Sequence, residues 1–341
     1  MERLDLKPLA FDRSLCSGLG STRSTSHGFV FIGKMTVSRI VPVKLLLLFC
    51  AAAAFTSAAE EKVAPLPALP PVGQLTTPGW RFEELRRFKA PEAGQGVAVD
   101  RDFFYAINNH TIGKYRKESG ERVAGWEGGA GGEIIHLNAG IIHRGRLYGI
   151  HSNYPGVPML SSLEIFDPAT LAHVESHSFG RMDGSFTWLD RSTELTAGRG
   201  GSSAGLTIGD CWIACFVHYG NRGAEPNRDG AWTQIIAFDD EWRRTAGWAL
   251  PPDLIARFGG RGYSASGGAF GPGGHLYLTG HDNTELYVVD FPKAGSVLKW
   301  IATLPIPAEG QAFCFDPEKK DMLYLILKRA KEVIVGRVTT P

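Results

Sequence analysis

The stretch Gly310-Gln-Ala-Phe-Cys-Phe-Asp316 sets a short apolar run behind a small residue, and four earlier stretches repeat this pattern. They are Gly96-Val-Ala-Val-Asp100, Asn138-Ala-Gly-Ile-Ile142, Gly184-Ser-Phe-Thr-Trp-Leu-Asp190 and Ser266-Gly-Gly-Ala-Phe270. Each run is followed by a turn and a second β-rich run. Units that recur about every 40 to 50 residues are typical of propeller blades, because one small sheet cannot bury both faces and must stack around an axis. The sequence therefore predicts an all-β chain folded as a β-propeller.

Five blades fit the spacing best, and a sixth blade within the long segment between Gly184 and Ser266 is the alternative. The last blade has only three strand-like runs, at residues 311–315, 322–327 and 332–338. Residues 82–88, just before the first blade, are placed to supply its fourth strand. Pairing the two ends of the domain would close the ring and remove exposed sheet edges.

Residues 35–59 have the pattern of a secretory signal peptide: basic Arg39 and Lys44, an apolar run over 45–55, and then Ser57-Ala-Ala59. The apolar run is too short for a comfortable membrane span. We therefore expect a secreted or periplasmic protein without a stable span after cleavage. Residues 1–34 are interpreted as a mis-called start or disorder, 60–79 as a Pro-rich linker, and 80–341 as the propeller domain.

The formal net charge of +1 argues against a nucleic-acid-binding surface. The propeller domain contains Cys211, Cys215 and Cys314, an odd number that excludes a fully paired disulfide framework, so buried thiols are expected. We expect a monomer whose partner is a small molecule or a glycan.

Propeller topology predicts where functional side chains gather. The loops before the innermost strand and after the second strand of each blade emerge at the same face of the channel. After second strands the chain places the pairs Asn109/His110, His151/Asn153, His218/Asn221 and His281/Asn283; before innermost strands it places Glu92, Gln95, His136, Asp183, Arg261, Tyr263, Glu309 and Gln311. A polar pocket at the channel mouth is therefore predicted.

Two kinds of chemistry are open to such a pocket. His110, His136, His151, His218 and His281 are candidate ligands of a divalent metal ion, which the sequence leaves open among zinc, iron, manganese and calcium. Carboxylates that meet at one axis could instead supply an acid and a base, as glycoside hydrolysis requires.

The candidate catalytic residues are Glu92, Asp183, Arg261, Tyr263 and Glu309. A His or Tyr could remove a proton beside a carboxylate while an arginine or a metal stabilises the enolate. The candidate substrate-binding residues are Gln95, Asn109, Asn153, Asn221, Asn283 and Gln311.

The fourth unit, Gly267-Gly-Ala-Phe-Gly-Pro-Gly-Gly-His-Leu-Tyr-Leu-Thr-Gly-His-Asp-Asn283, resembles the repeats of secreted lactonase-like and gluconolactonase-like propellers. The candidate site is similar in general design to that of cycloisomerase-type propellers. These resemblances imply an enzyme that acts on a carbohydrate or sugar-acid derivative as a lyase, cycloisomerase or lactonase. Because propellers host many functions, a binding module with a structural ion and a glycoside hydrolase remain alternatives.

Overall fold

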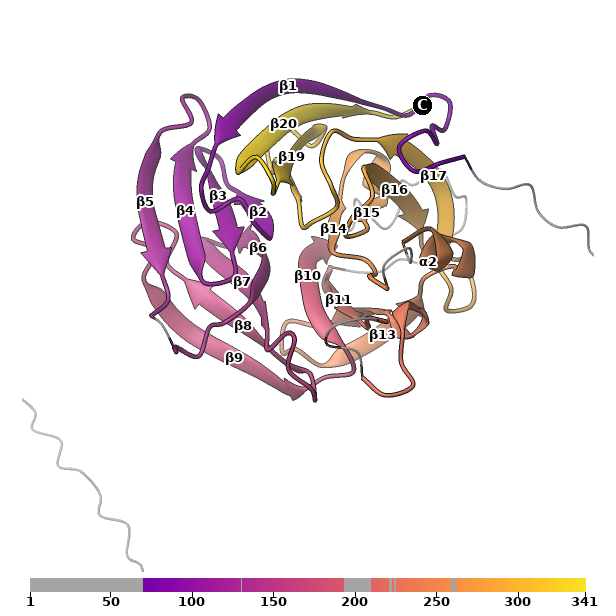
Figure 1. The fold of residues 1–341 in the computed structure, drawn as a ribbon, viewed down its shortest axis with the longest axis horizontal. Helices are drawn as coiled ribbons and strands as arrows, with labels where there is room; N and C mark the ends of the chain where they lie inside the picture. Colours follow the sequence, from indigo (N-terminus) through magenta and orange to yellow (C-terminus); the bar gives the residue numbers. More distant parts are fainter. Residues whose placement is uncertain (1–69, 130, 193–209, 221–222, 224, 259–261) are drawn as a thin grey trace, which may run out of the picture. The chain divides into compact units, whose positions relative to one another are not determined.

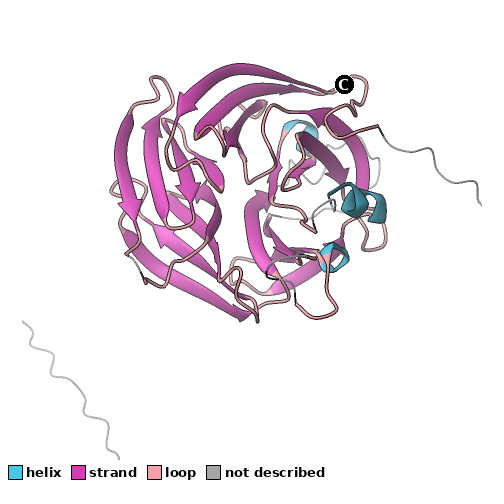
Figure 2. Cartoon of the chain, in the orientation of Figure 1, coloured by secondary structure: helices cyan, strands magenta, loops and turns pink. Residues whose placement is uncertain are grey.

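The computed structural model describes residues 70–129, 131–192, 210–220, 223, 225–258 and 262–341. The segments assigned to the signal peptide and to residues 1–34 lie outside these ranges, as do Asn221 and Arg261. The described chain belongs to one compact unit, Pro65–Pro341, whose regular secondary structure is almost all strand (Figure 2).

Five antiparallel four-stranded sheets form the blades of a propeller (Figure 1). The strands, from inner to outer, are β2 (Gly96–Val99), β3 (Phe103–Asn108), β4 (Thr111–Arg116) and β5 (Arg122–Glu127) in blade 1; β6 (Leu137–His143), β7 (Arg146–Ser152), β8 (Leu160–Phe166) and β9 (His173–Arg181) in blade 2; and β10 (Ser185–Ser192), β11 (Cys211–Val217), β12 (Gln234–Phe238) and β13 (Arg244–Ala249) in blade 3. Blade 4 has β14 (Gly267–Phe270), β15 (Leu276–Thr279), β16 (Glu285–Asp290) and β17 (Lys299–Pro305); blade 5 has β18 (Cys314–Phe315), β19 (Met322–Leu327), β20 (Glu332–Thr339) and β1 (Arg81–Lys89). The five-bladed prediction is confirmed, and the six-bladed alternative is wrong because β10 to β13 form a single sheet.

Strand β1 closes the ring. It pairs antiparallel with β20 from Arg81 opposite Thr339 to Lys89 opposite Glu332, so one blade contains the first and the last described strand. This is the closure predicted from the missing fourth strand. It leaves β20 with a partner on each side.

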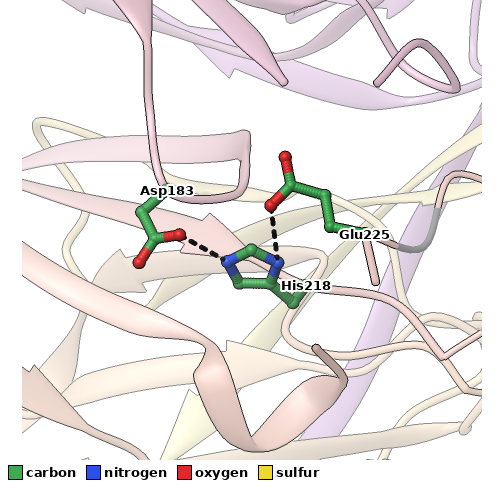
Figure 3. A group of neighbouring side chains, drawn as sticks. All are labelled: Asp183, His218 and Glu225. Carbon is green, nitrogen blue, oxygen red and sulfur yellow. Dashed lines mark ion pairs between the residues drawn. The ribbon is translucent and has the colours of Figure 1, made fainter. Parts of the chain in front are cut away.

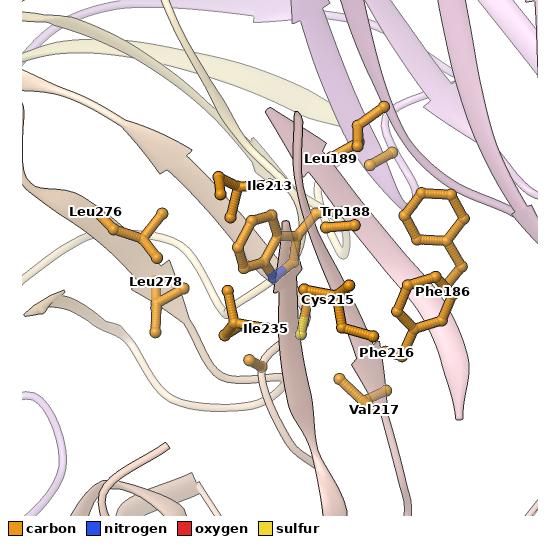
Figure 4. Close-up of a cluster of buried hydrophobic side chains, with 14 of the residues drawn as sticks. Phe186, Trp188, Leu189, Ile213, Cys215, Phe216, Val217, Ile235, Leu276 and Leu278 are labelled. Carbon is orange, nitrogen blue, oxygen red and sulfur yellow. The ribbon is translucent and has the colours of Figure 1, made fainter. Parts of the chain in front are cut away.

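The inner strands pack through apolar side chains that interdigitate between blades (Figure 4). Trp188 of β10 is 1 % exposed, and its ring lies against Gly268 of β14 in the next blade. A Cβ atom added at Gly268 would lie 2.3 Å from the Trp188 ring, so only glycine lets the two blades approach this closely. Trp188 is therefore a core residue.

Residues 70–79, the described part of the Pro-rich segment, lie against blade 4. The backbone N–H of Gly73 donates to Glu285 Oε1 at 2.8 Å. Arg257 of helix α2 (Pro252–Phe258) donates to the carbonyl oxygens of Pro70 and Pro71 and pairs with Glu285 at 2.5 Å. Because both charged side chains are buried, this contact fixes the segment that leads into β1.

In the part of the chain that the structure describes, no helix has the length and apolar character that crossing a bilayer requires.

Candidate functional site

A cavity of about 210 Å³ collects polar side chains from all five blades. Its walls combine loops that precede innermost strands, loops that follow second strands and the inner strands themselves. The described residues that line it are Gln95, His136, Asn138, Tyr154, Thr187, Tyr219, Tyr263, Ser266, His281, Gln311 and Lys328. Only the propeller axis is shared by all the blades, so the cavity lies on that axis.

Five of the residues singled out in the sequence meet here: Gln95, His136, Tyr263, His281 and Gln311. Four come from loops before innermost strands, and His281 follows β15. Loops before innermost strands and a loop after a second strand therefore contribute side chains to one cavity.

Six lining residues were not selected from the sequence: Asn138, Tyr154, Thr187, Tyr219, Ser266 and Lys328. Asn138 and Ser266 are the polar first residues of two repeated inner runs, so the repeat pattern could have indicated both as site residues. Lys328 occupies the position after β19 where other blades carry histidine. Tyr154 and Tyr219 directly follow Asn153 and His218. The sequence alone does not distinguish an aromatic residue that lines a cavity from one that packs in the core.

Hydrogen bonds within and between blades hold several polar groups of the cavity wall. Asn138 donates through Nδ2 to the carbonyl oxygen of Phe186 at 2.7 Å and to Ser152 Oγ at 3.0 Å. Gln95 donates through Nε2 to Asn109 Oδ1 at 2.7 Å. These bonds orient the amide groups before any ligand arrives.

Aromatic rings form a continuous arc in the cavity wall, which we call the aromatic arc. Successive ring centroids are 5.1 Å, 5.2 Å, 5.9 Å and 3.7 Å apart along the series His136, Tyr154, Tyr219, Tyr263 and His281. The last pair is stacked with an interplanar angle of 14°. His281 also contacts the Asp282 carboxylate through Nδ1 at 2.7 Å. The arc offers flat apolar faces beside hydrogen-bonding edges.

Two titratable side chains in the cavity respond to burial. Desolvation, the neighbouring His151 and the positive charge of Lys328 lower the pKa of His136 to about 4, so its imidazole is neutral at pH 7. Burial, followed by the charge of Lys331, lowers the pKa of Lys328. The described lining residues include no carboxylate, although the charges of Asp282 and Glu309 act on Lys328 in the direction that raises its pKa. Lys328 is the cationic group that an anion in the cavity would meet.

The three predicted acid–base carboxylates lie elsewhere, and each pairs with an arginine. Glu92 is buried in blade 1, where it accepts hydrogen bonds from Tyr115 and from Arg122, the latter at 2.8 Å. Glu309 lies 2.8 Å from Arg329. Asp183 lies 2.9 Å from Arg228. None of the three is among the described residues that line the cavity, and each contacts an arginine.

His151 does not line the cavity, because both of its ring nitrogens are used within blade 2. Nε2 accepts from the backbone N–H of Ile135 at 3.1 Å, and Nδ1 contacts Ser162 Oγ at 2.8 Å. Burial lowers its pKa. His110 is an exposed residue in the turn between β3 and β4. Neither histidine joins His136 and His281 at the axis.

The predicted asparagines outside the cavity have local roles. Asn153 shapes its own loop by donating to the Pro158 carbonyl and accepting from the Leu160 N–H. Asn283 donates to the Arg257 carbonyl and to the Tyr287 hydroxyl, both at 2.8 Å. Asn109 accepts the hydrogen bond from the side-chain amide of Gln95.

A second group, Asp183, His218 and Glu225, lies on blade 3 (Figure 3). His218 Nε2 is 3.3 Å from Asp183 Oδ1, and Nδ1 is 3.8 Å from Glu225 Oε2. One ligand atom from each residue lies within 4.8 Å of the others, so these three side chains could hold a metal ion. Glu225 was not singled out in the sequence, because it lies in the long connection between β11 and β12.

No family model matches the chain, and no curated protein matches it. Among solved structures, a glutaminyl cyclase from Myxococcus xanthus is 10 % identical, with 77 % of this chain and 98 % of that chain covered and a TM-score of 0.49. A gluconolactonase from Xanthomonas campestris is 12 % identical, with 71 % of each chain covered and a TM-score of 0.38. The WD40 propeller domain of Doa1 is 9 % identical, with 76 % and 97 % covered and a TM-score of 0.37. A gluconolactonase is thus among the structural neighbours, and function has to be argued from the site itself.

Proposed function

We propose that the protein is an enzyme that binds a small sugar acid in the axial cavity and acts on it by acid–base chemistry, as a lyase or cycloisomerase does. The observation that carries this proposal is the joint presence, in one cavity, of a neutral histidine and a lysine without a carboxylate among the described lining residues. Such a cavity favours a substrate that brings its own carboxylate.

The walls match the parts of a sugar acid. The aromatic arc provides faces for the C–H side of a sugar ring, and the amides of Gln95, Asn138 and Gln311 provide partners for hydroxyl groups. Lys328 supplies the counter-charge for the carboxylate.

In the proposed reaction, His136 accepts the proton from the carbon next to the substrate carboxylate, and Lys328 stabilises the negative charge that develops on that carboxylate. The bond to the leaving oxygen breaks as the carbon–carbon double bond forms. Tyr263 gives a proton to the departing oxygen. This chemistry uses cavity side chains alone and routes no step through the divalent ion expected from the sequence.

Glycoside hydrolysis is not part of the proposal, because the candidate carboxylates Glu92, Asp183 and Glu309 are each paired with an arginine. A hydrolase of this type needs two carboxyl groups that flank the same bond.

The proposal is tested by calorimetric titration of the purified protein with uronic acids, aldonic acids, their lactones and the matching neutral sugars, followed by turnover assays on each ligand that binds. Acidic sugars should bind and neutral sugars should not. Lys328→Met should weaken binding at least about tenfold, or about 1.4 kcal/mol. His136→Gln should keep the affinity within a few-fold and lower kcat by about a hundredfold or more.

Matched controls are Lys319→Met and His110→Gln, which change the same residue types at exposed positions. Acid binding with no turnover of any ligand would assign the cavity to a non-catalytic binding protein. Equal binding of acidic and neutral sugars, unaffected by Lys328→Met, would overturn the proposal altogether.

A further inference from the structure

The imidazole of His218 is buried in an unusual setting. Its side chain is 1 % exposed, and neither ring nitrogen has a hydrogen-bond partner among the described residues. Leaving two buried polar atoms without partners is costly, by about 1 to 3 kcal/mol for each. The nearest charged atoms are carboxylate oxygens of Asp183 and Glu225, which face opposite edges of the ring (Figure 3).

We propose that Asp183, His218 and Glu225 form a binding site for a divalent transition-metal ion of the zinc type. The site lies beside the axial cavity and does not depend on the proposed reaction. One imidazole nitrogen and two carboxylate oxygens are a donor set that suits zinc, manganese or ferrous iron, whereas calcium takes oxygen ligands only. An ion bonded to His218 gives a partner to a nitrogen that has no hydrogen bond to any described residue.

The two carboxylates are already oriented by other contacts. Asp183 Oδ2 accepts from Arg228 at 2.9 Å and from Gln234 at 3.1 Å. Glu225 Oε1 accepts from the backbone N–H of Met159 at 3.3 Å. In each case the other oxygen faces His218, and Asp183 Oδ1 also lies 2.9 Å from Arg228 Nη1. Groups that orient metal-bound carboxylates in this way strengthen metal binding about 10- to 100-fold.

The charges favour a cation. Asp183 and Glu225 carry two negative charges, Arg228 carries one positive charge, and a metal-bound imidazole adds none. A divalent cation would therefore bind to a cluster of side chains whose net charge is negative. One ion can bond only one of the two ring nitrogens, so the carboxylate beside the other nitrogen has to move toward the ion to reach a bond length of about 2.1 Å.

The location gives the ion a specific consequence. Asp183 precedes β10, His218 follows β11, and Glu225 lies in the connection from β11 to β12. One ion would link these three segments. Tyr219, adjacent to His218, belongs to the aromatic arc, so the ion would also fix one part of the cavity wall.

The test is to strip the purified protein with a chelator and titrate it with Zn²⁺, Mn²⁺ and Ca²⁺ by calorimetry. Elemental analysis gives the stoichiometry, and Co²⁺ loading gives a visible absorption spectrum. We expect one Zn²⁺ per chain, tighter than Ca²⁺, and a higher melting temperature with the ion bound. Asp183→Asn and Glu225→Gln should each weaken Zn²⁺ binding at least about tenfold and abolish the increase in melting temperature.

Asp290→Asn is the matched control, because Asp290 also contacts a histidine, His275, at 2.6 Å. Its metal affinity should equal that of the unchanged protein. The proposal is overturned if the folded, stripped protein takes up no stoichiometric metal, or if Asp183→Asn and Glu225→Gln bind Zn²⁺ as tightly as the control.

Discussion

The pKa of His136 depends on the side chains that surround it. Its ring lies 5.1 Å from Tyr154, and burial together with the charges of His151 and Lys328 lowers its pKa to about 4. In an unfolded chain the same group titrates near about 6.5. Folding therefore excludes a proton that the unfolded chain would bind at mildly acidic pH.

The sign of the pH effect follows directly. Between about pH 6.5 and about pH 4 the unfolded state binds more protons, so the free energy of unfolding falls as the pH falls, by at most about 1.4 kcal/mol per pH unit from this residue. His136→Gln should make this decline shallower, although His151 still contributes in the same direction. Urea unfolding followed by tryptophan fluorescence at several pH values measures the slope. The exposed control His110→Gln should keep the original slope; an unchanged slope in His136→Gln would contradict the assignment.

The four histidines predicted to follow second strands have four different environments, and His151 lies within β7 instead of after it. His110 is exposed, His151 is hydrogen-bonded at both nitrogens, His218 lies between two carboxylates, and His281 stacks on Tyr263. The repeat made them look equivalent. Their partners come from loops whose lengths differ between blades, and a single sequence does not reveal which side chains those loops bring near.

At the scale of single elements, close packing between inner strands depends on Gly268 against Trp188. Gly268→Ala would place a methyl carbon 2.3 Å from a rigid, fully packed ring, and overpacking of this kind costs about 1 to 3 kcal/mol. Denaturant unfolding measures the loss. Gly129→Ala is the matched control, since a Cβ there meets nothing within 4 Å. Equal stabilities of the two variants would show that blades 3 and 4 can separate without cost.

The innermost strand of blade 5 is shorter than predicted, and its neighbours explain why. The sequence indicated a strand over 311–315, whereas β18 is only Cys314–Phe315. The Gln311 carbonyl accepts from Thr279 Oγ1 at 2.8 Å, and the Ala312 N–H donates to the Gln95 carbonyl at 3.0 Å. The backbone here bonds to blades 4 and 1 instead of to β19. Contacts across blades therefore limit the strand, which local propensity cannot show.

At the scale of the whole molecule, the three described cysteines are free thiols. Burial raises the pKa of Cys211 to about 11 and that of Cys314 to about 12, and raises that of Cys215 further. Alkylation requires the thiolate, so at pH 8 each should react at least about a hundredfold more slowly in the native protein than in urea. Peptide-resolved mass spectrometry follows each site separately. Fast labelling of Cys215 in native protein would mean that blade 3 opens locally.

Much of the fold could be predicted because each blade repeats one apolar inner run and because the missing outer strand had an obvious donor at residues 82–88. The candidate site could be predicted only in part. Topology brought His136, Tyr263 and His281 together, but it could not show that Arg122 would pair with Glu92. A long-range ion pair leaves no periodic trace in the sequence.

The pairing of β1 with β20 also sets an order of events during synthesis. A ribosome delivers β1 before the four other blades and β20 after them, so β1 waits for its partner until those blades have been synthesised. Until then the nascent chain keeps an incomplete blade with unpaired backbone groups. A chain that stops before β20 leaves β1 without this partner, so only chains that extend through β20 can complete blade 5.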